Sequence, residues 1–280
     1  MFNKSGFMKA IRIVPEGNYQ GSGISHGLAR GLLVFWDDLN LTGEGMGIGS
    51  VAVREPDCTY FSRSWDDIAE GHMLRRTFDI DTRMSWSIFG KISPLLTQWI
   101  ESAIGAYMQM PSFQRILMLP VLPLRRVLYI HPVFETVPSH GQVTMTYVVK
   151  EGQVAVRAEI HSPTKVGSVI CLLNELSAEW FTNAVRDETI VPPPPAWERI
   201  TPKNPTASLY DPVHGIRFTL LLPSVSVSGM SPVESNIFWG REHTDDLCWA
   251  GFCIELGPLD GKQEVIEARY SIIIAGEPAT

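Results

Sequence analysis

The feature of this sequence that most constrains its fold is a long succession of short segments with the two-residue period of β-strands. In residues 153–161, the apolar side chains of Val154, Val156, Ala158 and Ile160 alternate with polar and charged ones, so one face of the segment is buried and the other is solvated. Comparable β-branched and aromatic segments, bounded by Gly, Pro, Asn or Asp, fill the chain before residue 93 and after residue 126. This pattern is typical of an antiparallel sandwich or barrel.

One stretch, residues 93–119, changes to a helical period. Ser93 is a suitable N-cap and Pro94 suits the first turn, since neither position leaves an unpaired amide hydrogen. Pro111 ends this helix, and residues 112–119 are expected to form a second, short one. Apolar side chains recur at intervals of three and four and predict one apolar stripe, formed by Leu95, Leu96, Trp99, Ile100, Ala103, Ile104, Tyr107 and Met108.

The length and composition are compatible with one large domain. The chain has 280 residues, of which 45% are hydrophobic and 19% charged, enough apolar surface for a sizeable core. The proline-rich residues 190–212 are expected to form a long loop or lid, because too few residues follow them to build a separate core. We therefore predict a single mostly β domain over residues 1–280, a large β-sandwich or barrel with one inserted amphipathic helical segment.

Charge and cysteine usage exclude several classes of partner. The net charge of −7 lacks the basic surface that nucleic-acid binding requires. The four cysteines lie far apart without any CxxC pair, which argues against a disulfide framework or a zinc knuckle and fits a reducing cytoplasm. The first 25 residues contain no export signal, so a cytoplasmic location is expected. The cysteines are Cys58, Cys171, Cys248 and Cys253.

The apolar run at residues 116–130 is the segment most suited to a membrane. It is too short to span one and is interrupted by prolines and by Arg125 and Arg126. We predict no transmembrane segment. Peripheral contact of this basic, apolar region with a membrane surface remains open as a route to a lipid-soluble substrate.

Residues 43–49 carry glycine at every second position. In a strand, this leaves one face without side chains, so a neighbouring backbone, a ring or a ligand can approach closely. The favoured interpretation is a bulged or tightly packed strand, and Glu44 is its one ionisable residue. The stretch matches neither the dinucleotide-binding nor the P-loop pattern, and the chain shows no cofactor motif, so no cofactor is predicted.

Asp37 and Asp38 are the best candidates among three adjacent acid pairs, since they follow the apolar run that ends at Trp36. Paired carboxylates can bind a hard cation or divide acid and base roles, although adjacent aspartates more often form turns. The seven histidines lack the spacings that place two on one face, so no metal site is predicted. A metal site assembled from distant parts of the chain stays open.

The C-terminal strands combine aromatic side chains with a few charged ones, which is the composition of a concave small-molecule site. Glu255 closes the apolar strand at 247–256, where burial is expected to raise its pKa towards that of a useful general base. Arg241 or His243 would be its counterpart. The ring faces expected to contact a ligand are those of Trp36, Trp239, Trp249 and Phe252.

The same region carries a family resemblance. Phe252-Cys253-Ile254-Glu255, followed by residues 257–262 and a final strand, resembles the close of galactose-mutarotase-like β-sandwich proteins. That resemblance implies a sugar-isomerising fold with a late catalytic glutamate at Glu255. Asn174-Glu175 is similar to the family's mid-chain Asn-His motif, with Glu175 in place of the histidine, which implies a substrate-binding role for Glu175.

The sequence is compatible with two functions. The first is a cofactor-independent acid/base isomerase, cyclase or hydratase-type lyase that acts on a small, largely hydrophobic or cyclic molecule. Glu255 would be its base, Arg241 or His243 would stabilise developing charge, and Asp37, Asp38 or Glu44 would be the acid. The second is a non-enzymatic binding module for an apolar molecule or a carbohydrate. The sequence does not decide whether the protein is an enzyme, and it predicts no oligomeric state.

Overall fold

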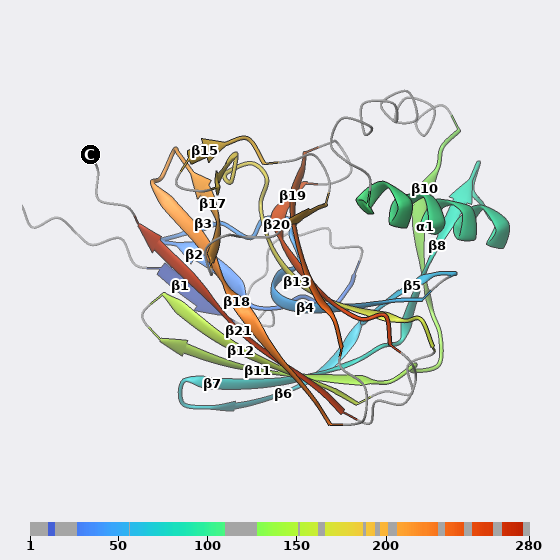
Figure 1. Ribbon diagram of the computed structural model, residues 1–280, viewed down its shortest axis with the longest axis horizontal. Helices are drawn as coiled ribbons and strands as arrows, with labels where there is room; N and C mark the ends of the chain where they lie inside the picture. The colour runs from blue at the N-terminus through green and yellow to red at the C-terminus, as the bar shows by residue number, and fades with distance from the viewer. Residues whose placement is uncertain are drawn as a thin grey trace, which may run out of the picture.

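The computed structural model describes residues 11–14, 27–55, 57–109, 128–150, 152–161, 166–186, 189–193, 197–200, 206–228, 233–243, 248–259 and 265–276. Two large antiparallel sheets dominate this part of the chain, and a small sheet lies beside them (Figure 1). The small sheet has the order β1 (Ile11–Val14), β2 (Leu33–Trp36) and β3 (Leu39–Asn40).

The first large sheet, sheet I, has nine strands among the described residues. Its neighbours follow the order β10 (His131–Thr136), β8 (Thr82–Ile88), β5 (Thr59–Phe61), β4 (Gly47–Arg54), β13 (Val169–Leu176), β20 (Cys248–Leu256), β19 (Ser235–His243) and β16 (Glu198–Ile200), with β9 (Lys91–Ile92) paired to β8.

The second large sheet, sheet II, also has nine strands in the described ranges. Their order is β15 (Thr189–Val191), β14 (Asn183–Arg186), β17 (Thr206–Asp211), β18 (Ile216–Ser228), β21 (Val265–Gly276), β12 (Gln153–His161), β11 (Gln142–Lys150), β7 (Met73–Asp79) and β6 (Ser64–Glu70).

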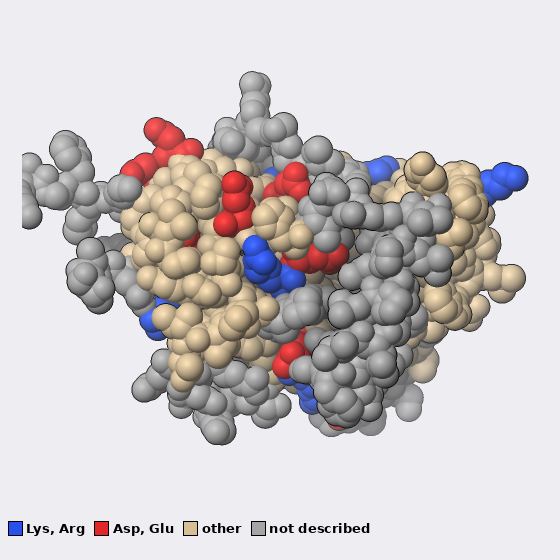
Figure 2. All heavy atoms as spheres, turned by 90° about the horizontal axis from the view of Figure 1, so that it is seen from above, with Lys and Arg blue, Asp and Glu red and all other residues tan. Residues whose placement is uncertain are grey.

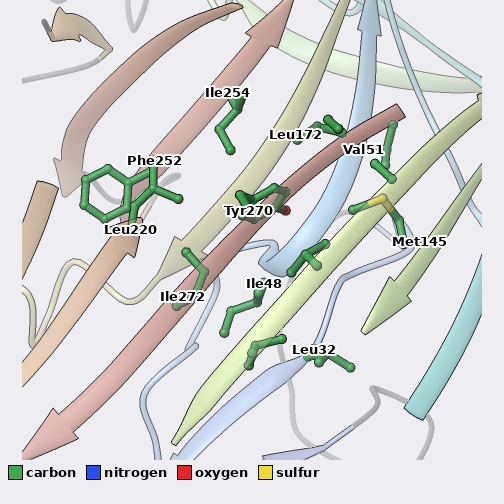
Figure 3. Close-up of a cluster of buried hydrophobic side chains, with 14 of the residues drawn as sticks. Leu32, Ile48, Val51, Met145, Leu172, Leu220, Phe252, Ile254, Tyr270 and Ile272 are labelled. Atoms are coloured by element: carbon green, nitrogen blue, oxygen red, sulfur yellow. The ribbon is translucent and has the colours of Figure 1, made fainter. Parts of the chain in front are cut away.

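The core lies between the two large sheets. Figure 3 shows side chains of sheet I facing those of sheet II, with Phe252 near Leu220 and Val51 near Met145. The alternation that the sequence shows at 153–161 is realised in β12, where Val154, Val156, Ala158 and Ile160 are all buried. Within the described part of the chain, each sheet ends in edge strands and neither closes on itself. The predicted mostly β fold is thus confirmed as a sandwich.

The predicted helix is present as α1 (Pro94–Gln109). Ser93 caps it by accepting a hydrogen bond from the Leu96 amide, 3.3 Å away. The Thr97 hydroxyl accepts a hydrogen bond of 2.8 Å from the Trp86 amide, which fixes the first turn to β8. Leu95 and Trp99, which the apolar stripe was expected to bury, are exposed instead.

The second predicted helix, at residues 112–119, lies outside the described residues. The helix that is described lacks the length and hydropathy that crossing a membrane would require.

The proline-rich residues 190–212 differ from the expected long loop. The described parts of this region include the end of β15 and all of β16 and β17. β15 and β16 are edge strands. Proline has no amide hydrogen to donate, and at the edge of a sheet this loss does not break a hydrogen bond between strands. The prediction of a lid was therefore wrong for these strands, because it weighed proline content without knowing their edge positions.

The glycine-rich residues 43–49 form a bulge, as the favoured interpretation expected. Leu173 pairs with Ser50 but the next residue, Asn174, pairs with Ile48, so Gly49 is the extra residue in β4. Gly49 has a φ of 74°. Its amide donates to the Asn174 side chain at 3.1 Å, and its carbonyl accepts a hydrogen bond of 2.7 Å from the Tyr147 hydroxyl.

A Gly49→Ala substitution tests the packing of this bulge. Its Cβ would lie 2.6 Å from the Tyr147 ring, whereas a Cβ at Gly90, which has the same φ of 74°, meets no described atom within 4 Å. We expect Gly90→Ala to lower the free energy of unfolding by roughly 1–2 kcal/mol and Gly49→Ala by about 1–3 kcal/mol more. Urea denaturation of both variants measures the difference. Equal losses would show that Tyr147 does not restrict this position.

Candidate functional site

The outer face of sheet I, which points away from the sandwich core, carries a second cluster of buried side chains. Because strand residues alternate between faces, β20 directs Cys253 and Glu255 to this side and Phe252 and Ile254 to the core. Helix α1 contacts β8, close to one edge of sheet I, and β16 at the opposite edge. The helix therefore connects strands near the two edges of this sheet, and it lies beside β8 and β10 in Figure 1.

An ion pair lies on this face. Nη1 of Arg54 is 2.8 Å from Oε1 of Glu255, and the Glu255 side chain is 8% exposed. At this distance the guanidinium and the carboxylate make a close, charge-assisted contact. Glu255 is thus a buried carboxylate whose charge is balanced by Arg54 but which retains capacity to accept a proton or a hydrogen bond.

Two thiols lie beside this carboxylate. Cys171 pairs across the strands with Glu255, and both Cys171 and Cys253 are buried free cysteines. One ligand atom from each of the three residues lies within 4.8 Å of the others. A hydrogen bond with Cys171, together with burial, raises the pKa of the Cys253 thiol well above its usual value.

Aromatic rings flank this polar group along the face. The rings of Trp197 and Trp249 stack with centroids 4.2 Å apart. Phe61 and Phe134 meet edge to face at 5.7 Å on the other side of the cluster. Phe238, in β19, pairs across the strands with Cys253 and belongs to the same cluster. The outer face therefore combines apolar and aromatic surface with a few charged groups, as small-molecule sites do.

A second carboxylate, Glu175, faces the same side. It pairs with Gly251, four positions before Glu255 in β20, a separation of roughly 13 Å along the strand. Its Oε2 accepts a hydrogen bond of 3.0 Å from the Met46 amide. Burial raises the pKa of Glu175 to about 7, and the charge of Glu242 adds to this, while the Met46 amide and Arg30 oppose it.

Of the predicted ligand-contacting rings, the structure places only that of Trp249 on the outer face. Trp239 and Phe252 belong to the core between the sheets, and Trp36 packs against that core. Phe252 lies in β20 with Glu255, and Trp239 lies in the neighbouring β19, but both face the opposite side of the sheet from Glu255. Composition alone identified these strands correctly but assigned their faces wrongly.

The predicted counterparts of Glu255 are not brought to it. Arg241 lies on the opposite face of sheet I, since its neighbour Gly240 is the residue paired with Gly251. Its guanidinium donates to the Ala178 carbonyl at 2.8 Å and lies 3.2 Å from Nδ1 of His243. Arg54, which the sequence analysis did not single out, takes the expected place beside Glu255.

The predicted acids also lie elsewhere. Asp37 and Asp38 form the exposed turn between β2 and β3, where Asp37 has a φ of 51°. Such turn positions suit aspartate. Glu44 is exposed in the glycine-rich segment. None of these three joins Glu255, whereas Glu175 does share its face.

A separate cavity of about 240 Å³ lies at the first turn of α1. Its lining includes Asp57, Cys58, Arg83 and Thr97, none of which the sequence analysis proposed as a site. Figure 2, which views the molecule from above, shows acidic and basic side chains interspersed near the middle of that face, with no broad basic patch among the described residues.

Comparison with known proteins gives structural likeness without sequence likeness. No family model and no curated protein matches the sequence. Among solved structures, a putative aldose 1-epimerase from Escherichia coli K12 is similar at 8% identity, covering 96% of this chain and 100% of its own, with a TM-score of 0.43.

Two further structures are similar over most of this chain. A protein from Synechocystis sp. PCC 6803 has 10% identity, covers 82% of this chain and 76% of its own, and has a TM-score of 0.33. A heparan sulfate lyase mutant from Pedobacter heparinus has 7% identity, covers 90% of this chain and 31% of its own, and has a TM-score of 0.36.

The raised pKa of Glu175 predicts a pH-dependent stability. The native protein holds this proton more tightly than the unfolded chain, so the stabilisation is present at pH 4 and is lost as the pH rises through about 7. Between pH 4 and pH 8, we expect wild-type protein to lose about 3 kcal/mol more unfolding free energy than Glu175→Gln. Urea denaturation across this range measures it.

Glu70→Gln, at an exposed carboxylate in β6, provides the control and should retain the wild-type pH dependence. Parallel stability curves for wild type and Glu175→Gln would contradict the assigned titration of Glu175.

Proposed function

We propose that this protein is a cofactor-independent acid/base isomerase that acts on a small cyclic molecule bound on the outer face of sheet I. The observation that carries the proposal is the Arg54–Glu255 ion pair, which places a buried carboxylate 2.8 Å from a guanidinium on this face. Glu255 is the general base. Arg54 holds the carboxylate in place and supplies positive charge where negative charge develops during the reaction.

Glu175 supports the acid half of this proposal. With a pKa raised to about 7, its carboxyl group can both hold and release a proton near neutral pH. It lies on the same face as Glu255 but in a different environment, and two carboxyl groups whose environments differ can divide acid and base roles.

The flanking aromatic groups support a ring-shaped ligand. Trp249 stacks on Trp197 and is 9% exposed, so one edge of the pair can border a bound molecule. Aldohexoses are the first substrates to test, because the resemblance of residues 252–262 to galactose-mutarotase-like proteins implies them. In the interconversion of their anomers, a base takes the O1 proton as the C1–O5 bond breaks and O5 gains a proton. The open aldehyde then rotates about C1–C2 and closes again by the reverse proton transfers, so no redox cofactor takes part.

The test follows the interconversion of freshly dissolved α-glucose and α-galactose by polarimetry. We expect wild-type protein to accelerate it and Glu255→Gln to lower the catalysed rate by about 100-fold or more. Glu70→Gln, remote from this face, should retain the wild-type rate. Unchanged turnover in Glu255→Gln would remove Glu255 as the base.

A non-enzymatic binding module is the alternative, and the stacked Trp197–Trp249 pair favours it, since such rings are also platforms for carbohydrate binding. Calorimetric binding of aldoses by wild-type protein and by Glu255→Gln separates the two functions. Binding without acceleration would favour the module, whereas acceleration that depends on Glu255 favours the enzyme. Neither binding nor acceleration would contradict sugars as the ligand.

A further inference from the structure

The geometry points to a binding site for a zinc-type divalent cation formed by Cys171, Cys253 and Glu255. These residues come from the neighbouring strands β13 and β20, and cross-strand pairing places Cys171 opposite Glu255 and Leu173 opposite Cys253. The three side chains therefore share the outer face of sheet I. All three are buried, and one ligand atom from each lies within 4.8 Å of the other two.

The distances suit a tetrahedral ion after small side-chain movements. Zinc binds sulfur at about 2.3 Å and carboxylate oxygen at about 2.0–2.2 Å, so tetrahedral ligands lie roughly 3.5–3.8 Å from one another. Moving each donor by about 1 Å would close the present separation. Two sulfurs favour zinc over the hard cations, which prefer oxygen. Three protein ligands leave a fourth position for water or another small ligand.

The surrounding charge also suits a bound cation. Two thiolates and one carboxylate carry three negative charges, which a divalent cation and the guanidinium of Arg54 would together neutralise. Nη1 of Arg54 is already 2.8 Å from Oε1 of Glu255, in the position of an outer-shell group that orients a metal-bound carboxylate.

A second group of possible ligands, Glu55, Asp57 and Cys58, provides an internal comparison. It offers one sulfur instead of two, and its Asp57 is exposed. Solvent competes for an exposed ligand, and a single thiolate gives less preference for zinc. We therefore expect zinc at the first cluster and use Cys58→Ser as the matched control.

The metal site is a proposal separate from the isomerase activity, although both involve Glu255. A cation held by Glu255 would occupy the carboxylate that acts as the base, so the metal-bound and catalytic states exclude each other. Binding is measured without substrate, so a failure of the isomerase proposal leaves the metal site standing. Turnover in metal-free protein likewise leaves the isomerase proposal standing if no cation binds.

The test uses the full chain, reduced with a phosphine and freed of metal, and titrated with Zn²⁺ by calorimetry and with Co²⁺ by absorption. We expect one Zn²⁺ per chain and a sulfur-to-cobalt charge-transfer band. Cys171→Ser and Cys253→Ser should each weaken Zn²⁺ binding by more than about 100-fold, since loss of an outer-shell partner alone costs 10–100-fold. Cys58→Ser should bind as wild type does.

Absence of binding, or binding that only Cys58→Ser removes, would overturn the proposal. Circular dichroism checks the folding of each variant, and Cys171→Ala and Cys253→Ala replace any serine variant that fails to fold. The strength of the charge-transfer band in wild-type protein reports the number of bound sulfurs independently of any variant. A spectrum without sulfur ligation would contradict the site even if every variant were unfolded.

Discussion

The bulge at Gly49 is the constraint on which the rest of the structure depends. Ile48 faces the core before the bulge, and Val51 and Val53 face it afterwards. Residues 48, 51 and 53 could not all share one face of a regular strand, because the side-chain period is two. The extra residue shifts the alternation of side chains between the two faces by one position. Arg54 therefore points away from the core and towards Glu255.

Both sheets hold this bulge in place. Asn174, from sheet I, accepts hydrogen bonds from the Gly49 amide and from the Tyr270 hydroxyl, each at 3.1 Å. Tyr147, which also belongs to sheet II, donates to the Gly49 carbonyl. These polar groups are buried and satisfied, so they fix the position of one sheet on the other more specifically than apolar contacts alone.

A chain of charged groups supports the segment just before the bulge. Asp67 binds the guanidinium of Arg76 through both oxygens, at 2.7 and 2.8 Å. Arg76 donates to the Arg30 carbonyl, and Arg30 donates to the carbonyls of Gly43 and Gly45. Glu175 accepts from the next amide, that of Met46. The packing of sheet II is thus connected through hydrogen bonds to a carboxyl group on the outer face of sheet I.

The sequence predicted the local elements better than their assembly. The alternation at 153–161 and the cap at Ser93 depend on neighbouring residues, and both features are present in the structure. The partner of Glu255 depends on the pairing of β4, β13 and β20, which no local pattern contains. Arg54 and Cys171 lie far from Glu255 in the sequence. The glycines at every second position of residues 43–49 were the one sequence signal for this arrangement. They indicated a bulge but not which strand would lie opposite it.

The placement of α1 has a consequence for the two edges of sheet I. Its first turn is fixed to β8 through Thr97, while the helix also reaches β16 at the far edge of the sheet. Within the described part of the chain, one helix therefore links β8, near one edge of sheet I, to β16 at the other edge. A movement of this helix would therefore change the surroundings of both edges of the sheet at once.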